Sequence, residues 1–257
     1  MLLEIHANPG GLSAAEFSEC VEGSGVNGVV VAQTQTVEGL TDYLAALKTR
    51  QITAFAGVEL RLKKGHVIFV PETGVEGLEG VDWTNGGEDW DNNALANLVA
   101  ERPGLLIGSH PYFRQDESPM GDRIYRVKGL TALVANRGQG PLSWDRLAQE
   151  AAQKHQIPAV ASGGGTSANL GRAAIALDDS VKTVSALADA LASNAFMIIE
   201  FDETNDRRTR ETAPASPRRD DGRGGRGPRS NDRDRRPRRD DRRSGKGGRG
   251  PRRPRRD

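Results

Sequence analysis

Cysteine is almost missing from this sequence, since Cys20 is the single cysteine in 257 residues. One cysteine cannot form an intrachain disulfide, which fits a reducing compartment, and we expect the protein to be cytoplasmic. Long apolar runs are also missing: Glu4 and His6 interrupt the first one, and no basic region precedes it. The sequence therefore predicts no signal peptide, no membrane span and no membrane partner.

Apolar residues are scarce in the last fifth of the chain. Residues 207–257 contain Ala213 and Ala215 but no aromatic residue and no Ile, Leu or Val. Such a segment cannot bury enough surface to offset the entropy lost on folding, so we expect it to be disordered. It carries 20 Arg and one Lys against eight acidic residues, a net charge of +13, which leaves 15 basic and 27 acidic residues, or −12, in residues 1–206. We therefore predict a barrel domain at 1–203 and a basic tail at 204–257.

Short β-like runs alternate with helical stretches in the body of the chain. Ser13 and Glu16 have the spacing of a capping box and predict a helix that runs to about Glu22. Strand–helix alternation implies parallel pairing and an α/β architecture, and about seven units in roughly 200 residues favour a small barrel over a doubly wound sheet. Strands are predicted at 2–6, 26–33, 52–60, 66–71 (as a hairpin partner), 104–110, 130–136, 157–163 and 196–201, and further helices at 40–50, 93–101, 144–155 and 184–193.

Three of the four histidines lie where predicted strands end. His6 ends the first strand, His66 comes just beyond the strand that ends near Glu59, and His110 ends a later strand. In a barrel of this kind, residues at the C-terminal ends of the strands meet at one mouth, where active sites lie. His155 falls near the end of a predicted helix, and an exposed surface position is the simplest interpretation there.

The order of these motifs resembles the PHP (polymerase and histidinol phosphatase) family over about residues 1–203. The resemblance implies a distorted seven-stranded (βα) TIM-like barrel that binds up to three divalent metals and hydrolyses phosphoesters. The closing helix and last strand of the family match residues 185–201. The family motifs His-x-His, Thr-Asp-His, Gly-x-Glu, His-Pro and Ser-Asp-Ala-His…Gly fall on His6–Asn8, Ala32–Thr34, Gly57–Glu59, His110–Pro111, and Ser162–Gly165 with Gly171.

Several ligand positions implied by the resemblance lack a suitable donor atom. Asn8 and Thr34 stand where the family has histidine, and Gln33 replaces an aspartate. Gly163 and Gly165 stand where the family has an aspartate and a histidine. Glycine has no side-chain donor, and threonine is a poor ligand for a transition metal beside imidazole.

The metal ligands that remain are His6, Glu59 and His110, with His66 as a further candidate. A cluster of two or three metals needs several carboxylates and imidazoles in fixed geometry, so we expect that it does not assemble. The favoured hypothesis is a non-catalytic scaffold without a cofactor, in which these residues line the barrel mouth. The alternative is a metal-dependent phosphoesterase or nuclease with one Zn²⁺ or Mn²⁺, since three protein ligands can hold a catalytic zinc.

Two other stretches each have two interpretations. The glycine-rich loop at 162–167 is either a ligand loop that has lost its ligands or a phosphate cradle of backbone N–H groups. The acidic stretch from Glu72 to Asp91 is either a cation site or, more simply, a solvated loop with Trp83 and Trp90 packed down as anchors.

The tail repeats Arg-Gly-Gly and Arg-Arg-Pro units. Arginine pairs with phosphate bidentately and stacks on bases, so the tail is typical of segments that bind RNA with little sequence preference. The expected partner is RNA or another nucleic acid; the alternatives are a ribonucleoprotein, an acidic protein, or a solubilising segment without a partner. The arginines expected to contact nucleic acid are Arg223, Arg226, Arg229, Arg235, Arg236, Arg238, Arg239, Arg242, Arg243, Arg249, Arg252 and Arg253.

Overall fold

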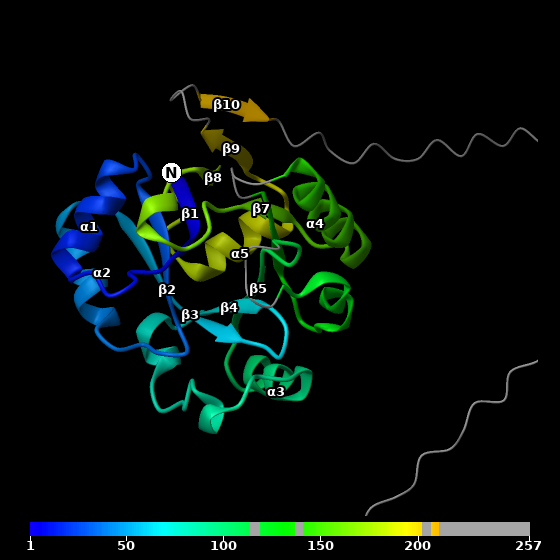
Figure 1. Cartoon of the computed structure of the whole chain (residues 1–257). Helices are drawn as coiled ribbons and strands as arrows, with labels where there is room; N and C mark the ends of the chain where they lie inside the picture. The colour runs from blue at the N-terminus through cyan, green and yellow to red at the C-terminus, as the bar shows by residue number, and fades with distance from the viewer. Residues whose placement is uncertain (114–118, 137–140, 202–206, 211–257) are drawn as a thin grey trace, which may run out of the picture. The chain divides into compact units, whose positions relative to one another are not determined.

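The computed structural model describes residues 1–113, 119–136, 141–201 and 207–210. Its ten strands form one sheet in the order β10-β9-β8-β1-β2-β3-β4-β5-β6-β7 (Figure 1). The strands are β1 Leu2–Ala7, β2 Gly28–Thr34, β3 Thr53–Arg61, β4 His66–Pro71, β5 Gly104–Ser109, β6 Ala132–Asn136, β7 Ala159–Ala161, β8 Ala173–Ala176, β9 Met197–Phe201 and β10 Arg207–Arg210. The α-helices are α1 Ala14–Gly23, α2 Leu40–Thr49, α3 Asn92–Glu101, α4 Leu142–His155 and α5 Val184–Ala192.

The sheet mixes parallel and antiparallel pairs. β1, β2 and β3 are parallel to one another, as are β5, β6 and β7, which agrees with the strand–helix alternation of the sequence. β4 pairs antiparallel with both β3 and β5, and β8, β9 and β10 continue antiparallel from β1. The α/β barrel class is therefore retained, but the predicted number of seven strands is not confirmed.

Strands β1 to β9 form a nearly closed, barrel-like sheet. The closure lies between the first strand and the loop after β7, where Ala7 forms a parallel bridge with Gly165. The backbone N–H of Asn8 donates to the carbonyl of Gly165 at 2.6 Å. The C-terminal end of β1 and the glycine-rich loop are thus held side by side, which decides where the candidate site lies.

The core follows the period-two pattern of the strands. On β2, Val30 and Ala32 join one buried cluster while Val29 and Val31 join the other, because successive side chains point to opposite faces. Helices α1 and α2 cover the outside of the early strands, and α4 packs against β6 and β7 (Figure 1). Helix α5 contributes Leu187 to the buried cluster that contains Val30 and Ala32. Helices and strands therefore pack together around the strand ends that carry the candidate site.

The predicted capping box of α1 is present. The Ser13 hydroxyl accepts from the backbone N–H of Glu16 at 3.3 Å, and the Glu16 carboxylate accepts from the backbone N–H of Ser13 at 2.9 Å. Helix α3 begins in a related way, since Asp91 accepts from the N–H groups of Asn93 and Ala94. Local side-chain chemistry therefore sets both helix starts.

The acidic stretch is a solvated loop with tryptophan anchors. Trp83 and Trp90 are buried, and their indole N–H groups donate to the carbonyls of Leu78 and Trp83 at 2.9 and 3.1 Å. The acidic side chains from Glu72 to Asp91 are exposed. The indole hydrogen bonds explain how two large rings are buried beneath so many charges.

Two strands lie outside the predicted pattern. β8 has the sequence Ala-Ala-Ile-Ala, which is too short and too weakly β-forming to be predicted, and it is held by pairing with β1 and β9. β10 consists of four residues that the composition assigns to the tail, and for these four residues the disorder prediction is not confirmed. An antiparallel strand needs only backbone partners, which the edge of β9 supplies. The rest of the predicted tail, including its twelve candidate arginines, lies outside the described residues.

No α-helix in the described ranges is long and apolar enough to cross a membrane.

Candidate metal centre

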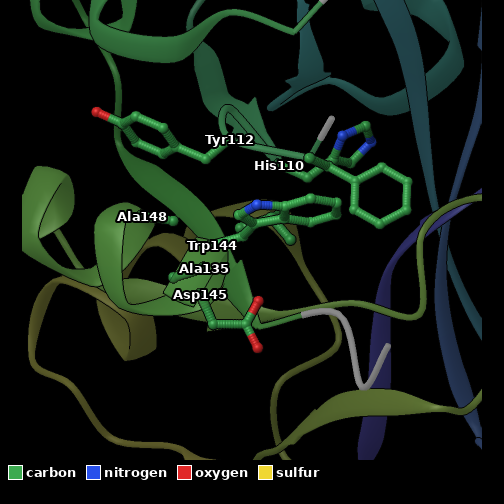
Figure 2. Close-up of a pocket in the computed structure, with 8 residues that line it drawn as sticks. His110, Tyr112, Ala135, Trp144, Asp145 and Ala148 are labelled. Atoms are coloured by element: carbon green, nitrogen blue, oxygen red, sulfur yellow. The ribbon is translucent and has the colours of Figure 1, made fainter. Parts of the chain in front are cut away.

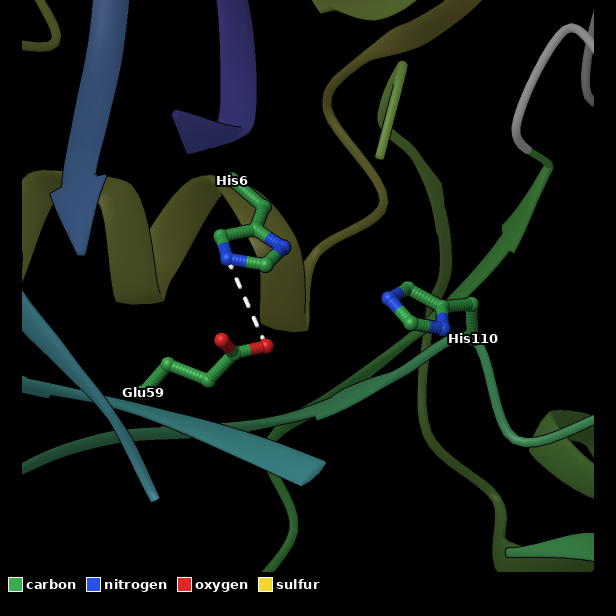
Figure 3. A group of neighbouring side chains, drawn as sticks. All are labelled: His6, Glu59 and His110. Carbon is green, nitrogen blue, oxygen red and sulfur yellow. Dashed lines mark ion pairs between the residues drawn. The ribbon is translucent and has the colours of Figure 1, made fainter. Parts of the chain in front are cut away.

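His6, Glu59 and His110 converge at one end of the barrel (Figure 3). Each offers one ligand atom, and these atoms all lie within 4.8 Å of one another. His6 Nε2 is 3.4 Å from Glu59 Oε1, and the imidazole rings of His6 and His110 are stacked with centroids 6.3 Å apart. The three residues are 4%, 6% and 9% exposed, so the group is shielded from bulk water.

The strands explain why three distant positions meet. His6 lies near the end of β1 and Glu59 near the end of β3, with β2 pairing to both, so their side chains share one mouth. His110 follows β5 directly and has φ of +27°, a backbone conformation that residues other than glycine seldom adopt. Such backbone conformations cluster at functional sites because the surrounding fold must hold them.

The group faces a pocket of about 220 Å³. His66, on β4, also lines this pocket, but it is half-buried and lies outside the group of three. The structure therefore brings three of the four predicted metal ligands together and places the fourth at the pocket wall. The pocket is lined by His6, Asn8, Thr34, Glu59, His66, His110, Gly164, Gly165 and Thr166.

Electrostatics favour the ionised form of Glu59. Burial alone would raise the pKa of its carboxyl group, but the positive charges of His6 and His66 and a hydrogen bond from Thr34 outweigh burial. The net effect lowers the pKa of Glu59 below its usual value, with His110 adding to it. A metal ligand must be deprotonated to bind: Glu59 meets this condition, and His6 meets it once its imidazole has released the proton whose charge lowers the pKa of Glu59.

The three side chains fit a single divalent ion. Tetrahedral zinc with bonds of about 2.0 to 2.1 Å places its ligand atoms about 3.4 Å apart. The His6–Glu59 distance of 3.4 Å already meets that spacing, and the ligand atom of His110 lies within 4.8 Å of the other two, so it must move closer to complete the set. Two imidazoles and one carboxylate also form the ligand set of catalytic zinc in several hydrolases.

The glycine-rich loop does not fit a second or third ion. A Cβ atom at Gly163 would overlap the carbonyl oxygen of Asn169, and one at Gly165 would lie 2.8 Å from Cε1 of His6. Gly165 also has φ of +85°, which disfavours any side chain. Side-chain ligands at these two positions would require a different loop backbone, so the loop as folded offers only backbone atoms there.

The loop surrounds the carboxyl group of a buried residue of β1, Glu4. Glu4 on β1 is fully buried and accepts from the Ser162 hydroxyl, from the backbone N–H of Gly163 at 2.9 Å and from that of Gly171 at 3.2 Å. Burial raises the pKa of Glu4 to about 7, although each of these hydrogen bonds lowers it. Glu4 is not among the site residues predicted from the sequence, although Glu4 and His6 stand two positions apart in an otherwise apolar strand.

This environment predicts a pH dependence of stability. The folded pKa of about 7 exceeds the ordinary value of 4.5, so the folded state binds the proton more tightly than the unfolded state. The contribution of Glu4 is therefore greatest below pH 4.5 and is lost as pH rises to about 7, by up to about 3 kcal/mol.

Urea unfolding of the wild type and of Glu4→Gln between pH 4.5 and 8 measures this contribution. We expect the wild type to lose stability relative to the variant as pH rises, because glutamine does not titrate. A difference that is constant over this range would contradict the raised pKa.

Aromatic packing supports the ring of His110 from its other side. Phe113 lies edge-on to His110 with centroids 5.9 Å apart, and Trp144 lies edge-on to Phe113 at 5.5 Å. The cavity that these residues line with Tyr112 and Asp145 measures about 10 Å³, room for one water molecule at most (Figure 2). This packing limits the orientations that the imidazole can adopt.

His155, the fourth histidine, belongs neither to the group of three nor to the pocket lining. It ends α4 and stacks on Tyr125 with centroids 5.5 Å apart, and Lys154 lies over the same Tyr125 ring at 4.3 Å. It is half-buried rather than exposed, because the Tyr125 ring covers one face of the imidazole. His155 therefore serves as a matched histidine control outside the pocket.

Comparison with known proteins identifies the fold through solved structures, but it finds no match by sequence. No family model matches the chain, and no curated protein matches its sequence. An amidohydrolase from Chromobacterium violaceum, with bound sulfate and no metal, is 12% identical with a TM-score of 0.53, covering 79% of this chain and 99% of its own. The chain therefore shares the mixed α/β, barrel-like fold of that enzyme.

Two further solved structures match at lower TM-scores. A protein described as a metal-dependent phosphoesterase, from Bifidobacterium adolescentis, is 12% identical with a TM-score of 0.49, covering 73% of this chain and 94% of its own. A lesion-specific endonuclease from Pyrococcus furiosus is 10% identical with a TM-score of 0.46, covering 81% of this chain and 57% of its own.

Proposed function

We propose that the chain is a metal-dependent phosphoester hydrolase of the PHP type, reduced to a one-metal centre. The observation that carries this proposal is the convergence of His6, Glu59 and His110 within 4.8 Å at the barrel mouth. The order of the PHP-like motifs supports the phosphoester class, and the related fold of an amidohydrolase that binds sulfate, a phosphate-shaped anion, is compatible with it.

His6, Glu59 and His110 would hold one Zn²⁺ or Mn²⁺. A bound ion supplies Lewis-acid polarisation of a phosphoryl oxygen and neutralises charge that develops during hydrolysis. His66 lines the same pocket and offers a donor to an anionic oxygen of the substrate. Gly164 and Gly165 line the pocket beside His6 without side chains, which leaves space for a phosphoryl group near the ligands.

The tail supplies a second proposal, which rests on its charge. A segment of +13 attached to a body of −12 attracts polyanions that the body repels. We infer that the tail binds RNA or another nucleic acid, either as a substrate of the centre or as a partner. If the centre takes no metal, a scaffold with this tail is the function that remains.

Metal stoichiometry of the full chain separates an enzyme from a scaffold. After loading with Zn²⁺ or Mn²⁺ and gel filtration, we expect about one ion per chain by elemental analysis. His6→Ala and His110→Ala should each lower the retained metal at least tenfold, because two remaining ligands cannot hold the ion. Hydrolysis of an aryl phosphodiester should fall with metal content.

His155→Gln is the matched control, since it removes an imidazole that lies outside the pocket. It should retain both metal and activity. Retention of metal by His6→Ala would place the ion elsewhere, no metal in the wild type would favour the scaffold, and two or more ions would contradict the reduced centre.

A further inference from the structure

A directed chain of hydrogen bonds ends on the candidate ligand Glu59. The backbone N–H of Gly10 donates to Asn8 Oδ1 at 3.0 Å, and Asn8 Nδ2 donates to Thr34 Oγ1 at 3.4 Å. The Thr34 hydroxyl in turn donates to Glu59 Oε2 at 2.6 Å. Asn8 and Thr34 are two of the positions at which the PHP resemblance has histidine ligands.

Each link in the chain fixes the direction of the next. The bond from Gly10 identifies the carbonyl side of the Asn8 amide, so the amide nitrogen faces Thr34. A hydroxyl has one proton, and Thr34 accepts from Asn8 while donating to the carboxylate. Charge-assisted hydrogen bonds to carboxylates are short and strong, which fits the 2.6 Å distance.

The two oxygens of Glu59 therefore have separate partners. Oε2 is held by Thr34, whereas Oε1 lies 3.4 Å from His6 Nε2 and belongs to the metal-ligand group. A carboxylate without such a restraint can rotate and bind an ion through both oxygens. Thr34 thus leaves one oxygen for the ion.

We propose that Thr34, backed by Asn8, is a positioning residue that makes Glu59 a one-oxygen ligand and so fixes a low coordination number. This inference rests on the proposed metal centre. It assigns to Asn8 and Thr34 a role that replaces metal binding: they hold a ligand instead of being one. Outer partners of this kind change metal affinity by about 10- to 100-fold.

Co²⁺ binding to the full chain tests the proposal without an activity assay. The d–d absorption of Co²⁺ is much stronger in four-coordinate than in higher-coordinate sites, so it reports coordination number. The wild type and Thr34→Ser, which keeps the hydroxyl, should bind one Co²⁺ with strong absorption. Thr34→Val, which keeps the shape, should bind about tenfold more weakly and with weaker absorption, because Glu59 gains freedom to bind through both oxygens.

We expect the lower end of the range because Thr34 lies at the exposed rim, where water replaces part of its hydrogen bond. Asn8→Ala is the second variant and should give a smaller change of the same sign, whether or not Thr34→Val folds. Unchanged affinity and spectrum in both variants would overturn the positioning role. Absence of Co²⁺ binding by the wild type would instead overturn the metal centre, and this inference with it.

Discussion

Alanine at position 163 is expected to destabilise the fold by about 3 kcal/mol or more. Its Cβ atom would overlap the carbonyl oxygen of Asn169 and lie 3.0 Å from Glu4 Oε2. Neither neighbour can move easily, because one is backbone and the other is the buried carboxyl group of Glu4, which is held by Ser162, Gly163 and Gly171. Overpacking in a rigid site costs about 1–3 kcal/mol, and backbone overlap lies at the upper end.

The control is Gly23→Ala, at the last residue of α1, where a Cβ meets nothing within 4 Å and φ is not positive. Alanine there should be neutral or stabilise by up to about 1 kcal/mol, since it reduces the entropy of the unfolded chain. Urea unfolding at one pH compares both variants with the wild type. A Gly163→Ala protein within about 1 kcal/mol of wild type would show that the loop adapts.

Removal of residues 211–257 is expected to abolish most affinity for RNA. This deletion keeps β10 and removes 17 Arg, one Lys and eight acidic residues, a charge of +10, which leaves −9 on residues 1–210. About five phosphate contacts give a slope of about −3.5 for single strands. Raising salt from about 50 to 200 mM should then weaken binding by the full chain about 100-fold.

A tail of equal length with its arginines replaced by glutamine is the matched control, since it keeps the chain length and loses the charge. Fluorescence titration with a single-stranded RNA at several salt concentrations gives the slope for each protein. Equal binding by residues 1–210 and the full chain would refute the assignment of RNA binding to the tail.

Strongly patterned elements were accessible from sequence because local chemistry decides them. Ser13 and Glu16 cap α1 through their own side chains, and alternating burial along β2 reflects strand geometry. β8 was not accessible, because four small residues become a strand only when β1 and β9 flank them. β10 was not accessible for the same reason, since its pairing with β9 depends on backbone groups and not on composition.

Some residues of the candidate site could be predicted from the sequence, and others could not. Position at strand ends pointed to His6, Glu59 and His110, because parallel strands bring their C-terminal ends together. Glu4 required three-dimensional information, since nothing local shows that Ser162 and Gly163 surround its carboxylate. The bond between Thr34 and Glu59 also depends on strand register, in which these two residues are direct neighbours.

The bridge between Ala7 and Gly165 has a consequence for the order of folding. It joins residues that are 158 positions apart, and contacts of such long range are costly in loop entropy and form slowly. During synthesis His6, Glu59 and His110 all emerge before Gly165, so these three side chains exist for a time without the backbone that later lies against His6. For the proposed metal centre, this order leaves an interval in which an ion can meet the three side chains before the barrel closes.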